Sequence, residues 1–507
     1  MKRSYFDVVV LGTDTGPLVA AALLARRGFR VLLLGQGDLS LSYRIGTFTL
    51  PRRQEHLLST ASPIMARVLE ELNLRQQYRR YSEPHLPGFQ VAMPGHRLDL
   101  HVDPGRLARE LKREFAQLHR PLLDFIQNVQ QQAERLDALL VGQLPLPPST
   151  LLERHRFSRT LRHHGLTHTA AWPDPLADFP DDHPFRQIRF SPAAFAWGSP
   201  QRCYDQLAIN RQYVNQHMRA VQLPSQVTGL RNLLLESIRS HNGVLMLDER
   251  ADALLIERRR VCGVRLQASG DEMSAGYLAA GIAIDTLSSL LPQRSLLEPM
   301  LDRTGEPQHT GYRYTLNLVV KREGIPAALG RTVYWLCGPD SQPCPTEALR
   351  MKRFACDPHH DLLSFEALVP LEQLGADHSA TLDLRTQVWS RVKELLPFVT
   401  EYTVVRDSPH DGLDPEINGD FGAGQELGRR GRHTLPRTYS YPRTTALSCA
   451  ALPVRTSVKR LLLCGQQVLP GLGPEGELLA AYGACQWISK KEQSSEWTRR
   501  RHWAQLG

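Results

Sequence analysis

The amino-acid sequence predicts an α/β protein of two domains. Three segments that lie far apart along the 507 residues, at 5–34, 229–284 and 461–489, each combine short apolar strands with a helix. A chain of this length exceeds what a single hydrophobic core normally serves, so two domains are expected. Apolar residues make up 42% and charged residues 22%, and this balance is typical of a globular protein.

The first segment predicts a strand, a helix and a second strand. The run YFDVVVL at 5–11 is apolar and β-branched, and a glycine-bearing turn follows it. An alanine- and leucine-rich helix is expected from about 16 to 27, ended by Gly28, and a second apolar strand reaches Leu34. Dinucleotide-binding folds place such a βαβ unit at the start of their nucleotide domain. We therefore expect a Rossmann-like domain here.

The rest of the chain changes pattern twice. Residues 53–228 read mainly as long helices broken by proline-rich connections. A helix is then expected at 229–241, followed by strands at 244–247, 251–256 and 261–266 and an apolar run at 278–284. Further on, alternating patterns predict a second sheet with strands at 311–320, 332–337 and 362–368, and an amphipathic helix at 379–396.

These patterns define the expected domains. A Rossmann-like domain takes residues 1–52, 229–292 and 455–489, and a substrate or cap domain takes 53–228 and 293–454. Residues 490–507 form a basic tail that contains two tryptophans. For this tail a solvated end, contact with a partner and contact with a membrane surface all stay open.

Three segments in a fixed order carry a family resemblance. They are DVVVLGTDTGPLVAAALLARRGFRVLLLGQGD at 7–38, GLRNLLLESIRSHNGVLMLDERADALLIERRRVCGVRL at 229–266 and LLLCGQQVLPGLGPEGELLAAYGA at 461–484. They resemble the FAD-binding segments of the phytoene desaturase family, whose fold is shared by flavin amine oxidases and Rab GDP-dissociation inhibitors. The resemblance implies a two-domain FAD-dependent oxidoreductase scaffold with an inserted substrate domain.

The resemblance also implies which residues would contact FAD. Ala251 would contact adenine through its backbone, and the glycine-rich loop at 465–476 would lie beside the flavin. In such enzymes the flavin takes up the hydride and the protein mainly positions the substrate, so no catalytic residue is predicted. The positions that match the family's cofactor contacts are Gly12, Asp14, Gly16, Gly35, Ala251, Gly465, Gln466, Gly471, Gly473 and Gly476.

The dinucleotide fingerprint departs from the family pattern. In G-x-G-x-x-G the glycines allow a tight turn, close approach of the diphosphate and close packing of helix on strand. This chain keeps Gly12, but Asp14 replaces the second glycine and Pro17 the third, and Gly16 lies one position early. Gly35 stands where the family has an acidic residue that binds a ribose hydroxyl. The usual contacts to FAD are therefore mostly changed.

Asp14 is the most severe of these changes. Like charges about 4 Å apart cost on the order of 4 kcal/mol near a protein surface, so its carboxylate would repel a diphosphate. Asp14, or Thr15 beside it, is instead expected to cap the helix and take the place of the phosphate. We expect FAD to be bound weakly or not at all, and restoring the two family residues, by Asp14→Gly and Gly35→Glu, to raise FAD affinity.

Other functional classes are less consistent with the sequence. The net charge of +9 is spread along the chain, which does not favour nucleic-acid binding. Four histidines lie at 155–168, and His164 and His168 have helical spacing, but no carboxylate or cysteine completes a metal site. No GxSxG motif or CxxC pair is present. No apolar run is long enough to span a membrane, so a cytoplasmic protein is expected, with peripheral membrane contact still open.

Two hypotheses for function follow. The first is an FAD-dependent oxidoreductase related to phytoene desaturases, acting on an apolar, isoprenoid-like substrate. The second is a non-catalytic member of the same fold that has lost FAD and binds an apolar small molecule or a protein partner in the old substrate cleft. The oligomeric state and the identity of the substrate or partner are not predicted.

Overall fold

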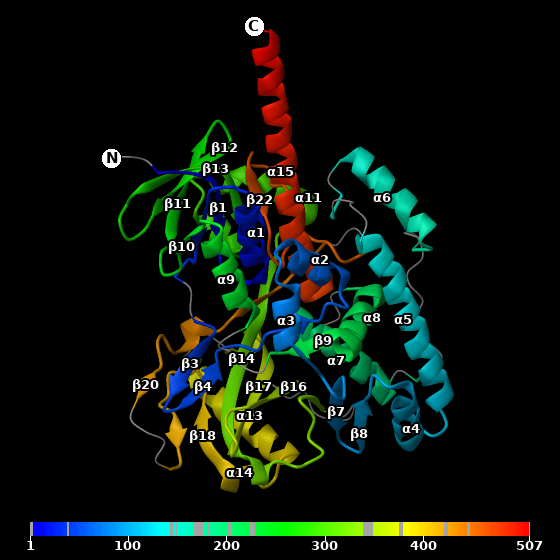
Figure 1. The fold of residues 1–507 in the computed structure, drawn as a ribbon. Coiled ribbons are helices and arrows are strands. Elements are labelled where there is room, and N and C mark those ends of the chain that lie inside the picture. The colour runs from blue at the N-terminus through cyan, green and yellow to red at the C-terminus, as the bar shows by residue number, and fades with distance from the viewer. Residues whose placement is uncertain are drawn as a thin grey trace.

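The structure is a computed structural model, and Figure 1 shows two sheet-containing parts, one above the other, with helices packed around them. It describes residues 4–37, 40–141, 146–148, 150–166, 176–177, 179–180, 182–200, 204–223, 229–337, 348–374, 379–419, 424–443 and 447–505.

The upper part in Figure 1 is built on a seven-stranded sheet in the order β10, β2, β1, β13, β12 and β11, with β22 paired to β13. β1, β2, β10, β13 and β22 are parallel, and β11 to β13 form an antiparallel meander. The three segments predicted to form one domain thus meet in one sheet. The strands are Tyr5–Leu11 (β1), Val31–Leu34 (β2), Val244–Met246 (β10), Ala251–Glu257 (β11), Arg260–Leu266 (β12), Glu272–Ala280 (β13) and Leu461–Leu463 (β22).

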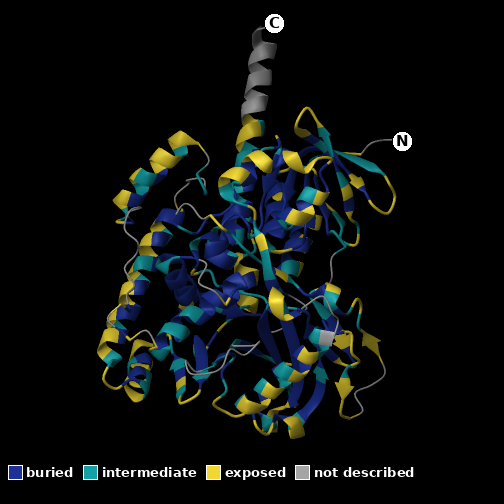
Figure 2. Cartoon of the chain, turned by 180° about the vertical axis from the view of Figure 1, so that it is seen from behind, coloured by how far each residue is buried: buried dark blue, intermediate teal, exposed yellow. Residues whose placement is uncertain are grey.

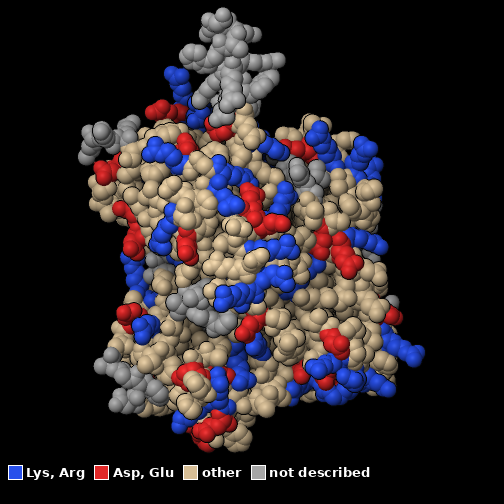
Figure 3. Space-filling view, viewed as in Figure 1, with Lys and Arg blue, Asp and Glu red and all other residues tan. Residues whose placement is uncertain are grey.

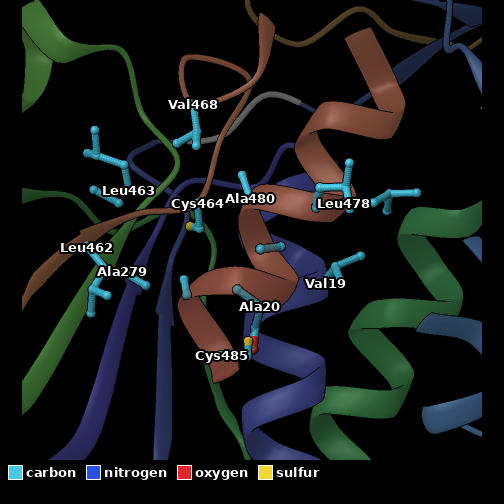
Figure 4. Close-up of a cluster of buried hydrophobic side chains, with 14 of the residues drawn as sticks. Val19, Ala20, Ala279, Leu462, Leu463, Cys464, Val468, Leu478, Ala480 and Cys485 are labelled. Atoms are coloured by element: carbon cyan, nitrogen blue, oxygen red, sulfur yellow. Dashed lines mark hydrogen bonds between the residues drawn. The ribbon is translucent and has the colours of Figure 1, made fainter. Parts of the chain in front are cut away.

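Two helices of this part pack closely because small residues lie between them. Helix α1 (Thr15–Arg26) is buried from Gly16 to Ala25, and α15 (Gly473–Gln505) lies against it. Figure 4 shows Ala20 of α1 beside Cys485 of α15, and the Cys485 thiol donates a hydrogen bond of 3.5 Å to the Ala20 carbonyl. Helix α9 (Leu230–Ser240) also packs on α1. The N-terminus of α1 is therefore held firmly between the sheet and α15.

The lower part contains a nine-stranded, mostly antiparallel sheet. The strands predicted at 311–320, 332–337 and 362–368 lie within β14, β15 and β17, and the predicted helix is α13 (Ser379–Leu395), whose apolar residues join the core beneath this sheet. The sequence patterns did not predict β16, β18, β19, β21 or the hairpin β7–β8. The strands are Phe89–Met93 (β7), His96–Leu100 (β8), Gln308–Lys321 (β14), Thr332–Leu336 (β15), Ala348–Ala355 (β16), His360–Pro370 (β17), Thr403–Asp407 (β18), Glu416–Ile417 (β19) and Arg437–Ser440 (β21).

The region 53–228 is mainly helical, as expected, but it also supplies five strands. The β7–β8 hairpin extends the lower sheet because β7 pairs with β15, an interaction that local periodicity does not reveal. Two small sheets join distant segments: Ser42–Ile45 (β3) and Phe48–Pro51 (β4) with Gln425–Glu426 (β20), and Leu57–Leu58 (β5) and Glu83–Pro84 (β6) with Ala220–Gln222 (β9). Figure 2 shows that buried residues concentrate in the strands and in the helices between the two parts.

The remaining helices cover the sides of both parts. Within the described residues, none is both long and apolar enough to cross a membrane. The tail predicted at 490–507 continues α15 as far as Gln505. The helices are Pro63–Glu71 (α2), Arg75–Tyr81 (α3), Pro104–Glu114 (α4), His119–Val141 (α5), Leu151–His163 (α6), Pro184–Trp197 (α7), Gln206–Val214 (α8), Ile284–Ser289 (α10), Glu298–Thr304 (α11), Leu371–Leu374 (α12) and Val399–Tyr402 (α14).

A buried ion-pair network joins the helical region to α15. Arg211 of α8 donates to both carboxylate oxygens of Glu475, at 2.7 and 2.8 Å, and to Asp137 of α5 at 2.5 Å. Ser62 donates to the same Glu475 carboxylate at 2.8 Å. Arg211 and Glu475 are inaccessible to solvent, so each charge depends on the other for compensation.

Candidate functional site

A cavity of about 500 Å³ lies between the two sheets, beside the carboxyl ends of β1 and β13. Ligands of open α/β sheets bind at this edge. Of the ten positions implied by the family resemblance, Asp14 and Gln466 line the cavity. The other lining groups come from the N-terminus of α1, the segment 53–57, strands β14 and β21 and the start of α15, and include Arg53, Arg313, Arg437 and Glu477.

Asp14 lies at the mouth of the cavity and pairs with Arg53. It occupies the N-cap position of α1, but its carboxylate makes no hydrogen bond to a helix N–H, so the prediction that it caps the helix is wrong. Arg53 Nη2 instead donates to Asp14 Oδ1 at 2.6 Å. The side chains of Asp14 and Arg53 are 51% and 36% exposed, so the pair adds little stability and mainly sets the charge beside α1.

Glu477 supplies a second carboxylate to the same helix end. It belongs to the first turns of α15 and lines the cavity together with Asp14, and the nearby Gly16 N–H of α1 favours its ionised form. Burial, together with the nearby Asp14 carboxylate, raises the pKa of Glu477 to about 7, although Arg53 and the Gly16 N–H act in the opposite direction. A carboxylate of the chain therefore lies near the helix N-terminus, where a bound phosphate would otherwise lie.

The remaining residues of the fingerprint serve chain packing. A Cβ on Gly16 would stand 2.1 Å from the Cys464 carbonyl oxygen, so α1 can approach β22 only with glycine there. Pro17 stands where the family has the glycine that allows helix and strand to pack closely. The Pro17 ring fits because residue 281 is glycine: a Cβ on Gly281 would lie only 2.4 Å from Pro17 Cγ. Gly12 has a φ of +103°, which explains why the turn retains it.

The corner expected to bind ribose is closed by backbone. A Cβ on Gly35 would stand 1.9 Å from the Leu247 carbonyl oxygen, and the Gly35 N–H donates to the Met246 carbonyl at 2.9 Å. No side chain fits at this position unless the chain after β10 moves away. The absence of an acidic residue at Gly35 is thus built into the packing. The packing does not favour the expected gain in FAD affinity from Gly35→Glu, which stays a prediction.

The corner expected to bind adenine is also filled. The Arg250 side chain lies over Gly37, where a Cβ would come within 2.1 Å of Arg250 Nε, and Ala251 is buried. Arg231 Nη1 donates to the Thr13 carbonyl at 3.1 Å and covers the loop after β1. The space left between Thr13, α1 and α9 is about 10 Å³, no more than one water occupies.

The C-terminal glycine-rich loop is used for close packing as well. A Cβ on Gly476 would stand 2.0 Å from the Leu469 carbonyl oxygen, and one on Gly471 would stand 2.8 Å from Cys449 Cα. Gly465 packs on the Gly281 backbone, and Gly473 has a φ of +52°. Gln466 donates to the Ala196 carbonyl at 3.4 Å. These glycines are required by the chain whether or not a flavin is present.

Behind Arg313 and His56, which line the opposite side of the cavity, lies a second group of charged residues. Arg313 of β14 pairs with Glu366 at 2.6 Å, and Arg350 pairs with the same carboxylate at 3.0 Å. Burial, reinforced by the Arg350 charge, lowers the pKa of the neighbouring Lys352 to about 7, and burial and Arg350 also lower that of His56 well below its usual value. Charged side chains therefore reach the cavity from two sides, while other lining residues, such as Leu57 and Ile284, are apolar.

These contacts do not fit a bound FAD. The diphosphate position faces two carboxylates, the ribose corner is closed by the Leu247 carbonyl, and the adenine corner holds Arg250. Sequence reasoning identified Asp14 but missed Arg53 and Glu477. Glu477 could have been predicted from its place, because it is a carboxylate in the first turns of the helix that follows the Gly/Pro loop. Nothing in the sequence pointed to Arg53.

No family model and no curated protein matches the chain. Solved structures do match along nearly its whole length. An oxidoreductase from Methanosarcina mazei has 13% identity, a TM-score of 0.54, and coverage of 94% of this chain and 99% of that chain. The PF1083 protein from Pyrococcus furiosus has 11% identity, a TM-score of 0.56, and coverage of 95% and 97%. Putrescine oxidase bound to putrescine has 12% identity, a TM-score of 0.59, and coverage of 96% and 99%.

At these identities the similarity shows the fold alone, and it confirms the predicted fold class and the resemblance at that level. A specific relationship to phytoene desaturases is not shown. The chain therefore shares the α/β fold of these solved structures, an oxidoreductase and putrescine oxidase among them.

Proposed function

We propose that this protein is a ligand-binding member of the fold that works without FAD, and that its cavity holds a small polar molecule. The observation that carries the proposal is the pair of carboxylates, Asp14 and Glu477, at the N-terminus of α1. A like-charge contact with a diphosphate at about 4 Å costs on the order of 4 kcal/mol, or roughly a thousandfold in affinity. This cost applies to Asp14, and to Glu477 when it is ionised, because the pKa of Glu477 is about 7. Arg53 offsets part of this cost, but it is already paired with Asp14.

The lining of the cavity favours a polar ligand over an isoprenoid. An apolar ligand would remove water from Asp14, Arg53, Arg313 and Glu477 without offering hydrogen bonds in return. Burying such groups without compensation is costly. The apolar substrate expected from the family resemblance is therefore not the ligand that these residues support.

The size of the cavity and one side chain are suited to a small polar ligand. A volume of about 500 Å³ is within the usual range for small-molecule sites. Gln467 lines the cavity with only 6% of its surface exposed, and its Nε2 has no hydrogen-bond partner among the described residues. A buried amide donor of this kind is satisfied by an acceptor on a ligand or by water.

Purified full-length protein tests the proposal. We expect it to lack the visible absorbance bands of flavin, to release no flavin when denatured, and to keep the same melting temperature when FAD is added. Native and denaturing mass spectrometry of the same sample would reveal a small polar molecule that copurifies. A yellow protein that releases stoichiometric FAD would contradict the proposal and support the alternative, an FAD-dependent oxidoreductase.

A further inference from the structure

Helix α6 carries a basic surface that the cavity does not use. Its buried side chains are Phe157 and Leu161, which anchor the helix in the core of the upper part. Figure 1 shows α6 at the outer edge of the molecule, and in Figure 2 most of its visible surface is exposed. Figure 3 shows basic side chains gathered in the same region. The outward side of this helix is therefore available to a partner.

All but one of the exposed residues of α6 form one face; the exception is Arg154, which lies to the side of Leu161. At 100° per residue, the outward side chains fall within about 140° of one another, opposite Phe157 and Leu161. Within the described part of the chain, the three arginines of this face form no ion pair. Glu153 is the acidic residue of the helix, and it is engaged in the capping box with Thr150. We call this face the α6 patch; it consists of Leu151, Leu152, His155, Arg156, Arg159, Arg162 and His163.

The α6 patch ends in two unusually exposed leucines. The side chains of Leu151 and Leu152 lie at the N-terminal end of the helix and are 83% and 60% exposed. Arg135 of α5 lies beside the other end, because a Cβ on Gly165 would stand 3.8 Å from its Nη1. The patch thus combines neighbouring cations with an apolar tip. His168, part of the histidine group noted in the sequence, lies outside the described residues.

We propose that the α6 patch docks the protein on an anionic membrane surface. Arginines are attracted to anionic lipid headgroups, and leucines beside them can enter the boundary between headgroups and acyl chains. Nucleic acid would satisfy the arginines but offers no apolar layer for Leu151 and Leu152, so lipid accounts for both halves of the patch. The contact is peripheral, and it involves no residue of the cavity.

Vesicle flotation of the full-length protein tests this inference. We expect binding to vesicles of phosphatidylcholine with phosphatidylserine, weaker binding as salt is raised, and no binding to phosphatidylcholine alone. The variant Arg156→Glu/Arg159→Glu/Arg162→Glu should lose roughly a hundredfold or more in partitioning. Leu151→Ser/Leu152→Ser should lose about tenfold while retaining the dependence on salt.

A matched control separates location from net charge. Arg258, Arg259 and Arg260 are exposed at the turn between β11 and β12, and changing all three to glutamate alters the net charge as much as the α6 variant does. This control should bind vesicles nearly as well as the natural protein. Equal loss in both triple variants, absence of vesicle binding by the natural protein, or preference for duplex nucleic acid over anionic vesicles would each overturn the inference. Unchanged melting temperatures would show that the variants fold.

Discussion

Gly35→Ala tests whether the ribose corner is closed by packing. The added methyl carbon would stand 1.9 Å from the Leu247 carbonyl oxygen, 2.6 Å from its carbonyl carbon and 2.7 Å from its Cα. Because Cβ atoms essentially never approach other heavy atoms within 3.0 Å, the two backbone segments must separate by about 1 Å. All three neighbouring atoms belong to the backbone, so no side-chain rotation relieves the contact.

The cost follows from the strain and from one hydrogen bond. Overpacking typically costs about 1–3 kcal/mol, and separating the segments also weakens the hydrogen bond from the Gly35 N–H to the Met246 carbonyl, worth about 1 kcal/mol. We therefore expect Gly35→Ala to destabilise the protein by about 2–4 kcal/mol, which is a large part of the stability of a typical domain. Urea unfolding followed by fluorescence measures this loss.

Gly105→Ala is the matched control. Gly105 lies in the first turn of α4 with an ordinary φ, and the nearest atom to an added Cβ is Asp103 Oδ1 at 3.4 Å. Alanine should therefore be neutral or stabilise by up to about 1 kcal/mol. If Gly35→Ala unfolds at the same urea concentration as the natural protein, or if Gly35→Glu creates tight FAD binding, the explanation for the ribose corner is wrong.

Three further predictions concern the charged groups. Glu477→Gln should stabilise the protein by up to about 3 kcal/mol near pH 8. The pKa of Glu477 in the folded protein is about 7, above the ordinary 4.5, so the natural protein loses stability as pH rises from about 4.5 to 7 and Glu477 ionises. The melting temperature of the variant should not fall with pH in this interval. The double variant Asp14→Gly/Glu477→Ala should make the N-terminus of α1 and Arg53 accessible to anions. Inorganic pyrophosphate should therefore raise the melting temperature of this variant but not that of the natural protein. Equal shifts in the two proteins would mean that the carboxylates do not block the site. Arg211→Leu should reduce the free energy of unfolding by about 3–5 kcal/mol because it leaves the buried Glu475 carboxylate without its arginine. Arg135 is exposed, and Arg135→Leu should change the free energy of unfolding by less than about 0.5 kcal/mol. Similar urea midpoints for the two variants would contradict the role of the buried pair.

Local sequence patterns predicted most of the elements that frame the site. The apolar run before Gly12, the helix that Gly28 ends and the strand to Leu34 appear as β1, α1 and β2. Each of these is specified by the spacing of apolar residues within a short window. The β7–β8 hairpin was missed because its place depends on pairing with β15, more than 200 residues away in the chain.

The sequence by itself determined the fold class, the order of the segments and the loss of the usual residues at Asp14 and Gly35. Only the tertiary structure decided what replaces them. Arg53 and Glu477 reach the end of α1 from distant parts of the chain, and the Leu247 carbonyl closes the ribose corner because β10 lies beside β2. The physical reason is that periodicity records which side of an element is buried, whereas the charge and free space at a site depend on which atoms the complete packing brings within a few ångströms.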